Sequence, residues 1–201
     1  MVTAIGRRPE TRRSRQTRQA LVEAARTVVR RTGSLSPEAV ATEAGVAPAT
    51  FYLHFANKDE ALAATFDAVL EELHATTTAA LDLERLLADG LERVVQDLAR
   101  NVVKGFRRDA GVVRLAISRL PEARPVQEVY REREDATLTM LTAFVRSGAR
   151  AGMVRAGDPG RIASALLVSV QGYQNPLLLQ PGTSAVLDEL VAMLLALLRP
   201  E

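Results

Sequence analysis

The residues of this chain whose type and spacing first suggest a chemistry are arginines near its N-terminal end. Six of them fall within twelve residues: Arg7, Arg8, Arg12, Arg13, Arg15 and Arg18. Residues 1–58 hold ten Lys and Arg against four Asp and Glu, whereas residues 59–201 hold sixteen against twenty. This asymmetry predicts a polyanion-binding end on a chain whose net charge is only +2. A solvated arginine-rich tail would have the same composition, so both interpretations stay open on charge alone.

The side-chain sets that support catalysis or metal binding are missing from the sequence. It contains no cysteine, and its two histidines are His54 and His74. Disulfides and thiolate sites are therefore excluded. We find no carboxylate pair beside a histidine, no glycine loop for a phosphate and no nucleophile elbow. The sequence predicts a protein that is not an enzyme, with no catalytic residues, no metal and no cofactor.

The hydrophobic pattern predicts an all-α protein of about nine helices, because apolar residues recur at helical spacing and no convincing strand appears. Prolines that can occupy a first helical position, and the glycines at 33 and 45, set several helix ends. The expected helices cover about 14–32, 37–44, 48–55, 57–73, 82–106, 112–120, 125–150, 159–175 and 184–199. Gly90 lowers the helix propensity within the expected helix at 82–106.

No segment of the sequence predicts export or membrane insertion. The charged N-terminal residues contain no apolar stretch of the kind a signal peptide needs. The longest apolar run, Leu190–Leu198, has nine residues, far short of the ~20 that cross a bilayer. We expect a cytoplasmic protein with no membrane partner.

Two short helices joined by a tight turn at Ala44-Gly45-Val46 form the pattern of a helix-turn-helix. Gly45 permits the backbone bend, and Val46 can fill the angle between the helices. The second helix of such a motif presents its N-terminal residues to base edges in the major groove of DNA. Helix pairs joined by glycine are common in all-α proteins, so this shape alone is a weak signal.

The full string from Leu35 to Leu62, LSPEAVATEAGVAPATFYLHFANKDEAL, is far more specific. It closely resembles the DNA-binding signature of the TetR/AcrR family of transcriptional regulators. The residues that carry the resemblance are Ala41, Ala44, Gly45, Val46, Thr50, Tyr52, His54, Phe55, Lys58 and Leu62. The signature covers about a seventh of the chain, and the remainder agrees in helix number and length.

The resemblance implies DNA contacts for particular residues. Ser36 would cap the second helix and touch a phosphate, and Thr50, Tyr52, His54 and Lys58 would also reach phosphates. Base reading would fall to Pro48, Ala49, Thr50 and Leu53, with Phe51 and Phe55 in the core beneath them. Two alternatives remain at the level of sequence: His54 as an ordinary half-buried histidine, and Tyr52 as a core residue.

This chain departs from the family pattern at the start of the recognition helix. Ala47 stands where a hydroxyl residue usually caps that helix, and Pro48-Ala49 replaces a polar residue and glycine. Both changes remove hydrogen-bond donors. We therefore expect few direct hydrogen bonds to bases, and mainly apolar contacts with thymine methyl groups. A flexible basic arm over residues 1–13, together with Arg15, can compensate by entering the minor groove. The arm arginines that we assign to DNA binding are Arg12, Arg13 and Arg15.

The rest of the chain is expected to bind an effector and to dimerise. The domains are then the arm at 1–13, the helix-turn-helix domain at 14–58, and the effector-binding and dimerisation domain at 59–201. The last helix is apolar on every side, and the family resemblance implies a two-fold homodimer through the last two helices. A central helix of a monomeric bundle would give the same pattern.

Apolar residues of the middle helices are our candidates for an effector pocket. They are Phe66, Leu70, Leu87, Leu91, Phe106, Ile117, Tyr130, Met140, Phe144, Leu166, Val170 and Tyr173, with Asn101, Gln127, Gln171 and Asn175 as further polar groups. Taken singly, each apolar residue could equally be core. Because no charge pattern demands a charged ligand, we expect a small, mostly apolar effector.

The predicted function is that of a dimeric repressor that binds a pseudo-palindromic DNA operator and is released by its effector. The sequence does not exclude an activator. The alternative from another class is a helical protein-interaction or ligand-binding module that has lost specific DNA binding, which the missing cap at Ala47 would favour.

Overall fold

The computed structural model describes residues 11–175, 178, 180 and 182–200. Over these residues the chain forms nine α-helices and a short 3-10 helix, and no strand. The helices are α1 (Arg12–Thr32), α2 (Pro37–Glu43), α3 (Pro48–His54), α4 (Lys58–Ala80), α5 (Leu83–Arg108), α6 (Ala110–Arg119), α7 (Arg124–Arg150), α8 (Pro159–Gln171), η1 (Gly172–Gln174) and α9 (Ser184–Leu198). The prediction of an all-α fold with about nine helices is confirmed.

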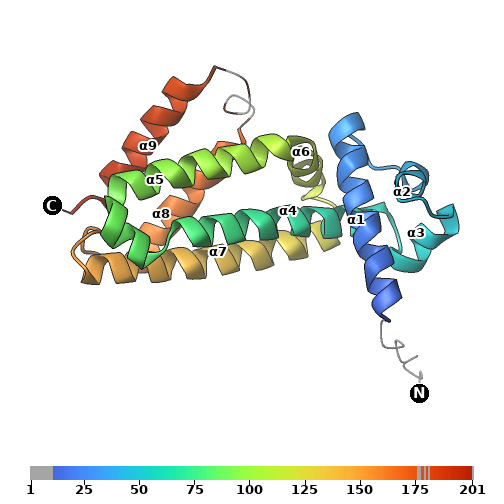
Figure 1. Cartoon of the computed structure of the whole chain (residues 1–201), viewed down its shortest axis with the longest axis horizontal. Coiled ribbons are helices and arrows are strands. Elements are labelled where there is room, and N and C mark those ends of the chain that lie inside the picture. The colour runs from blue at the N-terminus through green and yellow to red at the C-terminus, as the bar shows by residue number, and fades with distance from the viewer. Residues whose placement is uncertain (1–10, 176–177, 179, 181, 201) are drawn as a thin grey trace.

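The first three helices form a small head at one end of an elongated molecule (Figure 1). Their shared core is built on Leu21, Val40, Phe51 and Phe55, all of which are almost completely buried. The short helices α2 and α3 cannot be stable in isolation. Packing against the long α1 therefore holds them in place.

The remaining helices form the body, in which α4, α5 and α7 run side by side along the long axis (Figure 1). Helix α7 packs against both α4 and α8, and α5 packs against α4 and α9. Helix α6 lies at the junction, where it contacts α1, α4 and α5. None of the helices in the described part of the chain is long and apolar enough to cross a membrane.

Several helix boundaries differ from the sequence prediction, among them the start of α1 and the end of α4. Helix α1 begins at Arg12 rather than near Ser14, because the Thr11 hydroxyl accepts a hydrogen bond from the Ser14 amide and caps the helix. Helix α4 continues to Ala80, beyond the expected end near Leu73, through a run of threonines with low helix propensity. Burial of Thr77 and Ala80 against the body overrides that propensity.

Helix α5 is broken at Gly90, which has φ 80° and ψ 163°. Only glycine adopts this region readily. The break changes the register of the preceding turn, so that Leu86 is buried and Leu87 is 58 % exposed. Leu87, which the sequence offered as a pocket candidate, therefore lies on the surface.

Candidate DNA-binding surface and ligand pocket

The turn between α2 and α3 has the geometry that its sequence predicts. Gly45 adopts φ +67°, and the Val46 amide donates to the Ala41 carbonyl at 3.0 Å. Val46 packs against the core of the head. Ser36 caps α2 by accepting from the Ala39 amide, while its hydroxyl donates to the Glu38 carboxylate at 2.8 Å. In this arrangement the Ser36 hydroxyl proton is already engaged.

Helix α3 is anchored by its aromatic residues and exposes its other side. Phe51 and Phe55 are buried, with ring centroids 5.4 Å apart. Leu53 is 82 % exposed and Tyr52 is 54 % exposed, so Tyr52 is not a core residue. Pro48 and Ala49 are also exposed, and Thr50 and His54 are half-buried. Ala47 occupies the N-cap position with no side-chain hydrogen bond, as its side chain requires.

Lys58 begins the long helix α4 beside this surface. Asn57 accepts from the Glu60 amide at 3.0 Å, and the Glu60 carboxylate accepts from the Ala56 amide at 2.8 Å. This reciprocal capping fixes the start of α4. Lys58 is exposed and forms no ion pair with any described residue. Its ammonium group is therefore available to an anion.

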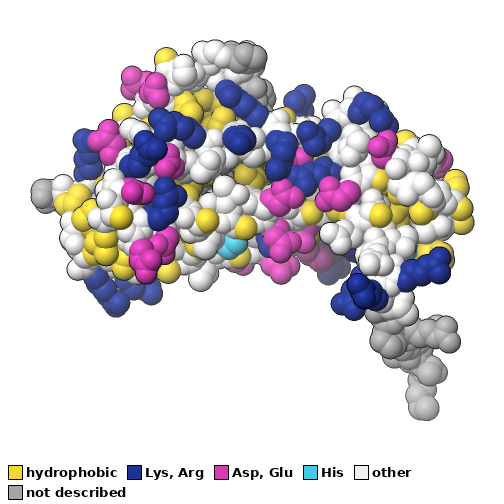
Figure 2. All heavy atoms as spheres, in the orientation of Figure 1, with side chains coloured by type: hydrophobic (Ala, Val, Ile, Leu, Met, Phe, Trp, Pro, Cys, Tyr) yellow, Lys and Arg dark blue, Asp and Glu magenta, His cyan; other side chains and the backbone are white. Residues whose placement is uncertain are grey.

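The arginines assigned to the arm divide between two parts of the chain. Arg12, Arg13 and Arg15 lie within α1 and are exposed, so the arm does not extend through residue 13 as predicted. Arg18 is also on α1, with its guanidinium carbon 4.8 Å from the centroid of the Phe55 ring. Arg7 and Arg8 lie outside the described residues. Basic side chains surround the lower end of α1 in Figure 2.

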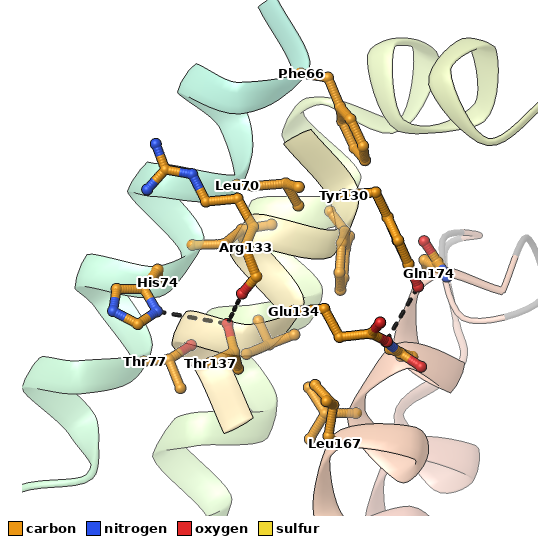
Figure 3. A pocket seen from close by; sticks show the side chains of 15 residues that line it. Phe66, Leu70, His74, Thr77, Tyr130, Arg133, Glu134, Thr137, Leu167 and Gln174 are labelled. Atoms are coloured by element: carbon orange, nitrogen blue, oxygen red, sulfur yellow. Dashed lines mark hydrogen bonds between the residues drawn. The ribbon is translucent and has the colours of Figure 1, made fainter. Parts of the chain in front are cut away.

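The body contains a cavity of about 680 Å³, including its open mouth, between α4, α5, α7, α8 and η1 (Figure 3). Five of the predicted pocket residues line it: Phe66, Leu70, Phe106, Tyr130 and Val170. Ile117 lines a second hollow of about 650 Å³, which shares Phe106 and Gln174 with the first.

Besides Leu87, which is exposed, five other predicted pocket residues line neither hollow. Phe144, Leu166 and Tyr173 are buried in the core, and Leu91 and Met140 pack against it. The Tyr173 hydroxyl has no hydrogen-bond partner among the described residues, and its burial raises the pKa of Tyr173 to about 12. The core alternative therefore describes these side chains better than the pocket does.

The four further polar candidates also divide between residues that line a hollow and residues that do not. Gln171 lines the cavity and Asn175 the second hollow. Gln127 donates to the Leu120 carbonyl at 2.6 Å, and Asn101 is exposed.

The sequence analysis missed most of the polar cavity wall. Helix α4 lines the cavity at i, i+3, i+4 and i+7 with Leu70, Leu73, His74 and Thr77, and α7 does so with Tyr130, Arg133, Glu134 and Thr137. This spacing marks one helix face. The polar residues among these that were not predicted are His74, Thr77, Arg133, Glu134 and Thr137. A search for polar residues on the apolar face of a long helix would have found them.

Hydrogen bonds connect the polar groups of the cavity across α7 and α8. Gln171 donates to the Tyr130 hydroxyl at 3.1 Å and to the Glu134 carboxylate at 2.8 Å. Burial and the neighbouring Glu134 raise the pKa of Tyr130. His74 Nδ1 lies 3.4 Å from the Thr137 hydroxyl. The cavity is thus apolar over most of its wall, with polar groups where α7 faces α8 and where it faces α4.

A charge cluster, buried at Arg26 and Asp109, joins the head to the body. Arg26 of α1 donates to the Asp109 carboxylate in two hydrogen bonds of 2.7 Å, and to Glu72 of α4 at 2.6 and 3.0 Å. Arg108 also bonds both carboxylates. Burial alone would raise the pKa of Asp109, but the hydrogen bonds from Arg26 and Arg108 lower it below its ordinary value. The Arg26 hydrogen bonds likewise lower the pKa of Glu72.

Comparison with known sequences finds the family signal in the head. Residues 21–65 match the profile of the N-terminal domain of the tetR family of bacterial regulatory proteins. A comparison with curated proteins finds no match. The matched segment runs from α1 into α4 and includes the whole helix-turn-helix.

Solved structures extend the likeness to the whole fold. A protein from Mesorhizobium loti MAFF303099, described as a TetR-family transcriptional regulator, superposes with a TM-score of 0.75 at 21 % identity, over 94 % of this chain and 100 % of that one. The SmeT–triclosan complex gives 0.65 at 21 % identity, over 92 % of both chains. The flavonoid-responsive regulator FrrA gives 0.62 at 24 % identity, over 92 % of this chain and 98 % of that one. The chain therefore carries a DNA-binding domain of the tetR family at residues 21–65, and its fold as a whole is similar to that of solved TetR-family regulators.

Proposed function

We propose that this regulator is a homodimeric repressor that binds a pseudo-palindromic operator and is released by a small molecule in the body. The observation that carries the proposal is the recognition helix α3. It turns Pro48, Ala49 and Leu53 to solvent while Phe51 and Phe55 fix it to α1. The exposed Leu53 side chain can make apolar contacts with thymine methyl groups in the major groove.

Groups that can bind phosphates surround α3. Lys58 at the start of α4 combines a free ammonium with the N-terminus of a 23-residue helix. Tyr52 is exposed beside it, and the His54 ring forms no hydrogen bond with the described residues. Arg12, Arg13 and Arg15 add positive charge on α1. Together these residues can fix the register of the head on a duplex while α3 reads bases.

The proposed dimer interface lies on α8 and α9. Val168 is 69 % exposed and Met193 is 58 % exposed, and Val186 adds a third exposed apolar side chain. Helix α9 has no charged residue from Leu190 to Leu198. A second copy related by a two-fold axis would cover these side chains. The same axis would place two recognition helices about one duplex turn, ~34–36 Å, or a multiple of it apart.

Helix α4 is the proposed connection between ligand and DNA. Its Leu70 and His74 line the cavity, while Glu72, between them in sequence, bonds Arg26 of the head. A ligand that prefers one position of α4 would therefore bias the orientation of the head. The similar folds of SmeT, solved in complex with triclosan, and of the flavonoid-responsive regulator FrrA support a small-molecule effector here.

The deciding experiment selects bound fragments from a genomic pool with the purified full chain, at two salt concentrations. We expect enrichment of a pseudo-palindrome that persists at the higher salt, and loss of that enrichment in Leu53→Asp. Arg146→Ala, an exposed change on α7, is the matched control and should select the same sequence. Unselective binding that disappears with salt would instead favour the interaction-module alternative.

Dimerisation is tested by sedimentation of the free protein. The full chain should sediment as a dimer, and Met193→Glu should shift it towards the monomer. A monomeric full chain at micromolar concentration would contradict the two-fold arrangement.

A further inference from the structure

We propose that the cavity selects a ligand that carries one positive charge on an aromatic or aliphatic body, with Glu134 as the group that receives the charge. This inference deepens the proposed function by naming the chemical class of the effector. It also makes the expectation of a small, mostly apolar effector more specific, by adding a single positive charge.

The geometry of Glu134 is the starting point. It lies on α7 in the middle of the cavity wall, and its side chain extends towards α8 in Figure 3. One carboxylate oxygen accepts from Gln171 at 2.8 Å. No arginine, lysine or histidine among the described residues forms an ion pair with it, because the adjacent Arg133 turns away and pairs with Asp67 at 2.5 Å and Glu71 at 3.5 Å. The second oxygen of Glu134 is left to a ligand or to water.

The hydrogen bonds of Gln171 determine how its amide group is oriented. A carboxylate only accepts, so the amide nitrogen of Gln171 must face Glu134. That nitrogen donates to both Tyr130 and Glu134, which uses its two protons. The amide oxygen of Gln171 and the second oxygen of Glu134 are then both acceptors. A protonated amine supplies N–H groups to such a pair.

The remaining wall suits the body of such a ligand. The Phe66 and Tyr130 rings are nearly parallel, at 9° and with centroids 6.5 Å apart, and Phe106 and Leu70 lie on the same cavity. Aromatic faces attract cations as well as apolar groups. A neutral apolar ligand would displace water from Glu134 without replacing its hydrogen bonds, which costs free energy. An anion would in addition be repelled by the carboxylate.

The test compares three ligands with one carbon skeleton: 4-phenylbutylamine, 4-phenylbutanol and 4-phenylbutyrate. At neutral pH they carry a positive, zero and negative charge, and binding is read as the rise in melting temperature of the full chain. We expect the amine to bind about tenfold more tightly than the alcohol, because one charge-assisted hydrogen bond contributes about that gain in affinity. The butyrate should bind most weakly.

Two variants connect the preference to Glu134. Glu134→Gln keeps an acceptor for Gln171 but removes the charge, and should bind the amine and the alcohol equally. Glu132→Gln, at an exposed position of the same helix, should keep the preference. Equal binding of all three ligands to the unchanged chain, no binding of any of them, or a preference that survives Glu134→Gln would overturn the inference.

The outcome is separable from that of the proposed function. Selection of operator DNA needs no ligand, so a chain that binds DNA specifically but prefers the alcohol keeps the proposed function and loses this inference. A chain that prefers the amine but selects no DNA keeps this inference and loses the proposed function.

Discussion

Arg26 of α1 and Asp109, at the start of α6, are joined by two parallel hydrogen bonds of 2.7 Å although 83 residues separate them in sequence. The Asp109 side chain is completely buried, and that of Arg26 is nearly so. The pair fixes the DNA-binding head to the body at the point where α5 ends and α6 begins. Glu72 of α4 accepts from the same guanidinium, so three helices meet at one arginine.

Removing the Arg26 side-chain charge should strongly destabilise the protein. Arg26→Met leaves Asp109 buried with only Arg108 as a partner, and breaking a buried pair on one side costs about 3–5 kcal/mol. Urea denaturation measures the loss. Arg31→Met, which removes the exposed pair with Glu43, is the control and should cost less than about 1 kcal/mol. Similar losses in the two variants would show that burial does not strengthen the Arg26 pair.

Acid should weaken the same junction. The pKa values of Asp109 and Glu72 are lowered in the folded protein. Depressed carboxylates stabilise the fold above their unfolded pKa, near 4, and this stability is lost as pH falls through the folded values. The test compares the unchanged chain with a double variant that carries both Arg26→Met and Asp109→Leu. Between about pH 6 and pH 3, the free energy of unfolding should fall more steeply for the unchanged chain than for this double variant. If the free energy of unfolding fell equally steeply with pH in both proteins, other groups would be responsible for the acid sensitivity.

Tyr173→Phe should leave the stability unchanged or raise it by about 1 kcal/mol, because the buried hydroxyl has no partner among the described residues. In a chain of this size that corresponds to a rise in melting temperature of about 2–4 °C. Tyr130→Phe is the comparison, since its hydroxyl accepts from Gln171 and its loss should lower stability. A clear loss in Tyr173→Phe would reveal a partner for that hydroxyl.

Lys58→Ala should weaken operator binding and reduce its salt dependence. Each phosphate contact contributes about 0.9 to the slope of log affinity against log salt, so a dimer that loses two lysines should lose about 1.8. Fluorescence anisotropy over a salt series measures the slope. Lys104→Ala, at an exposed site of α5 outside the head, should leave the slope unchanged. An unaltered slope in Lys58→Ala would remove this residue from the DNA interface.

The sequence by itself determined the features that depend on neighbouring residues. Ser36-Pro37 and Asp158-Pro159 set helix starts, and Gly45 set the turn before α3, because caps, proline and positive φ act locally. Helical periodicity gave the fold class, and the string from Leu35 to Leu62 gave the family.

Only the tertiary structure decided which residues face the cavity and which charges meet. Phe144, Leu166 and Tyr173 have the same helical spacing as cavity residues, but the packing of α7, α8 and η1 places them in the core. Gly90 moved Leu87 to the surface by changing the register of its turn. Glu134 lies at the cavity without a cation, and Asp109 is paired with Arg26, because contacts between distant helices depend on how those helices cross, which local patterns do not encode.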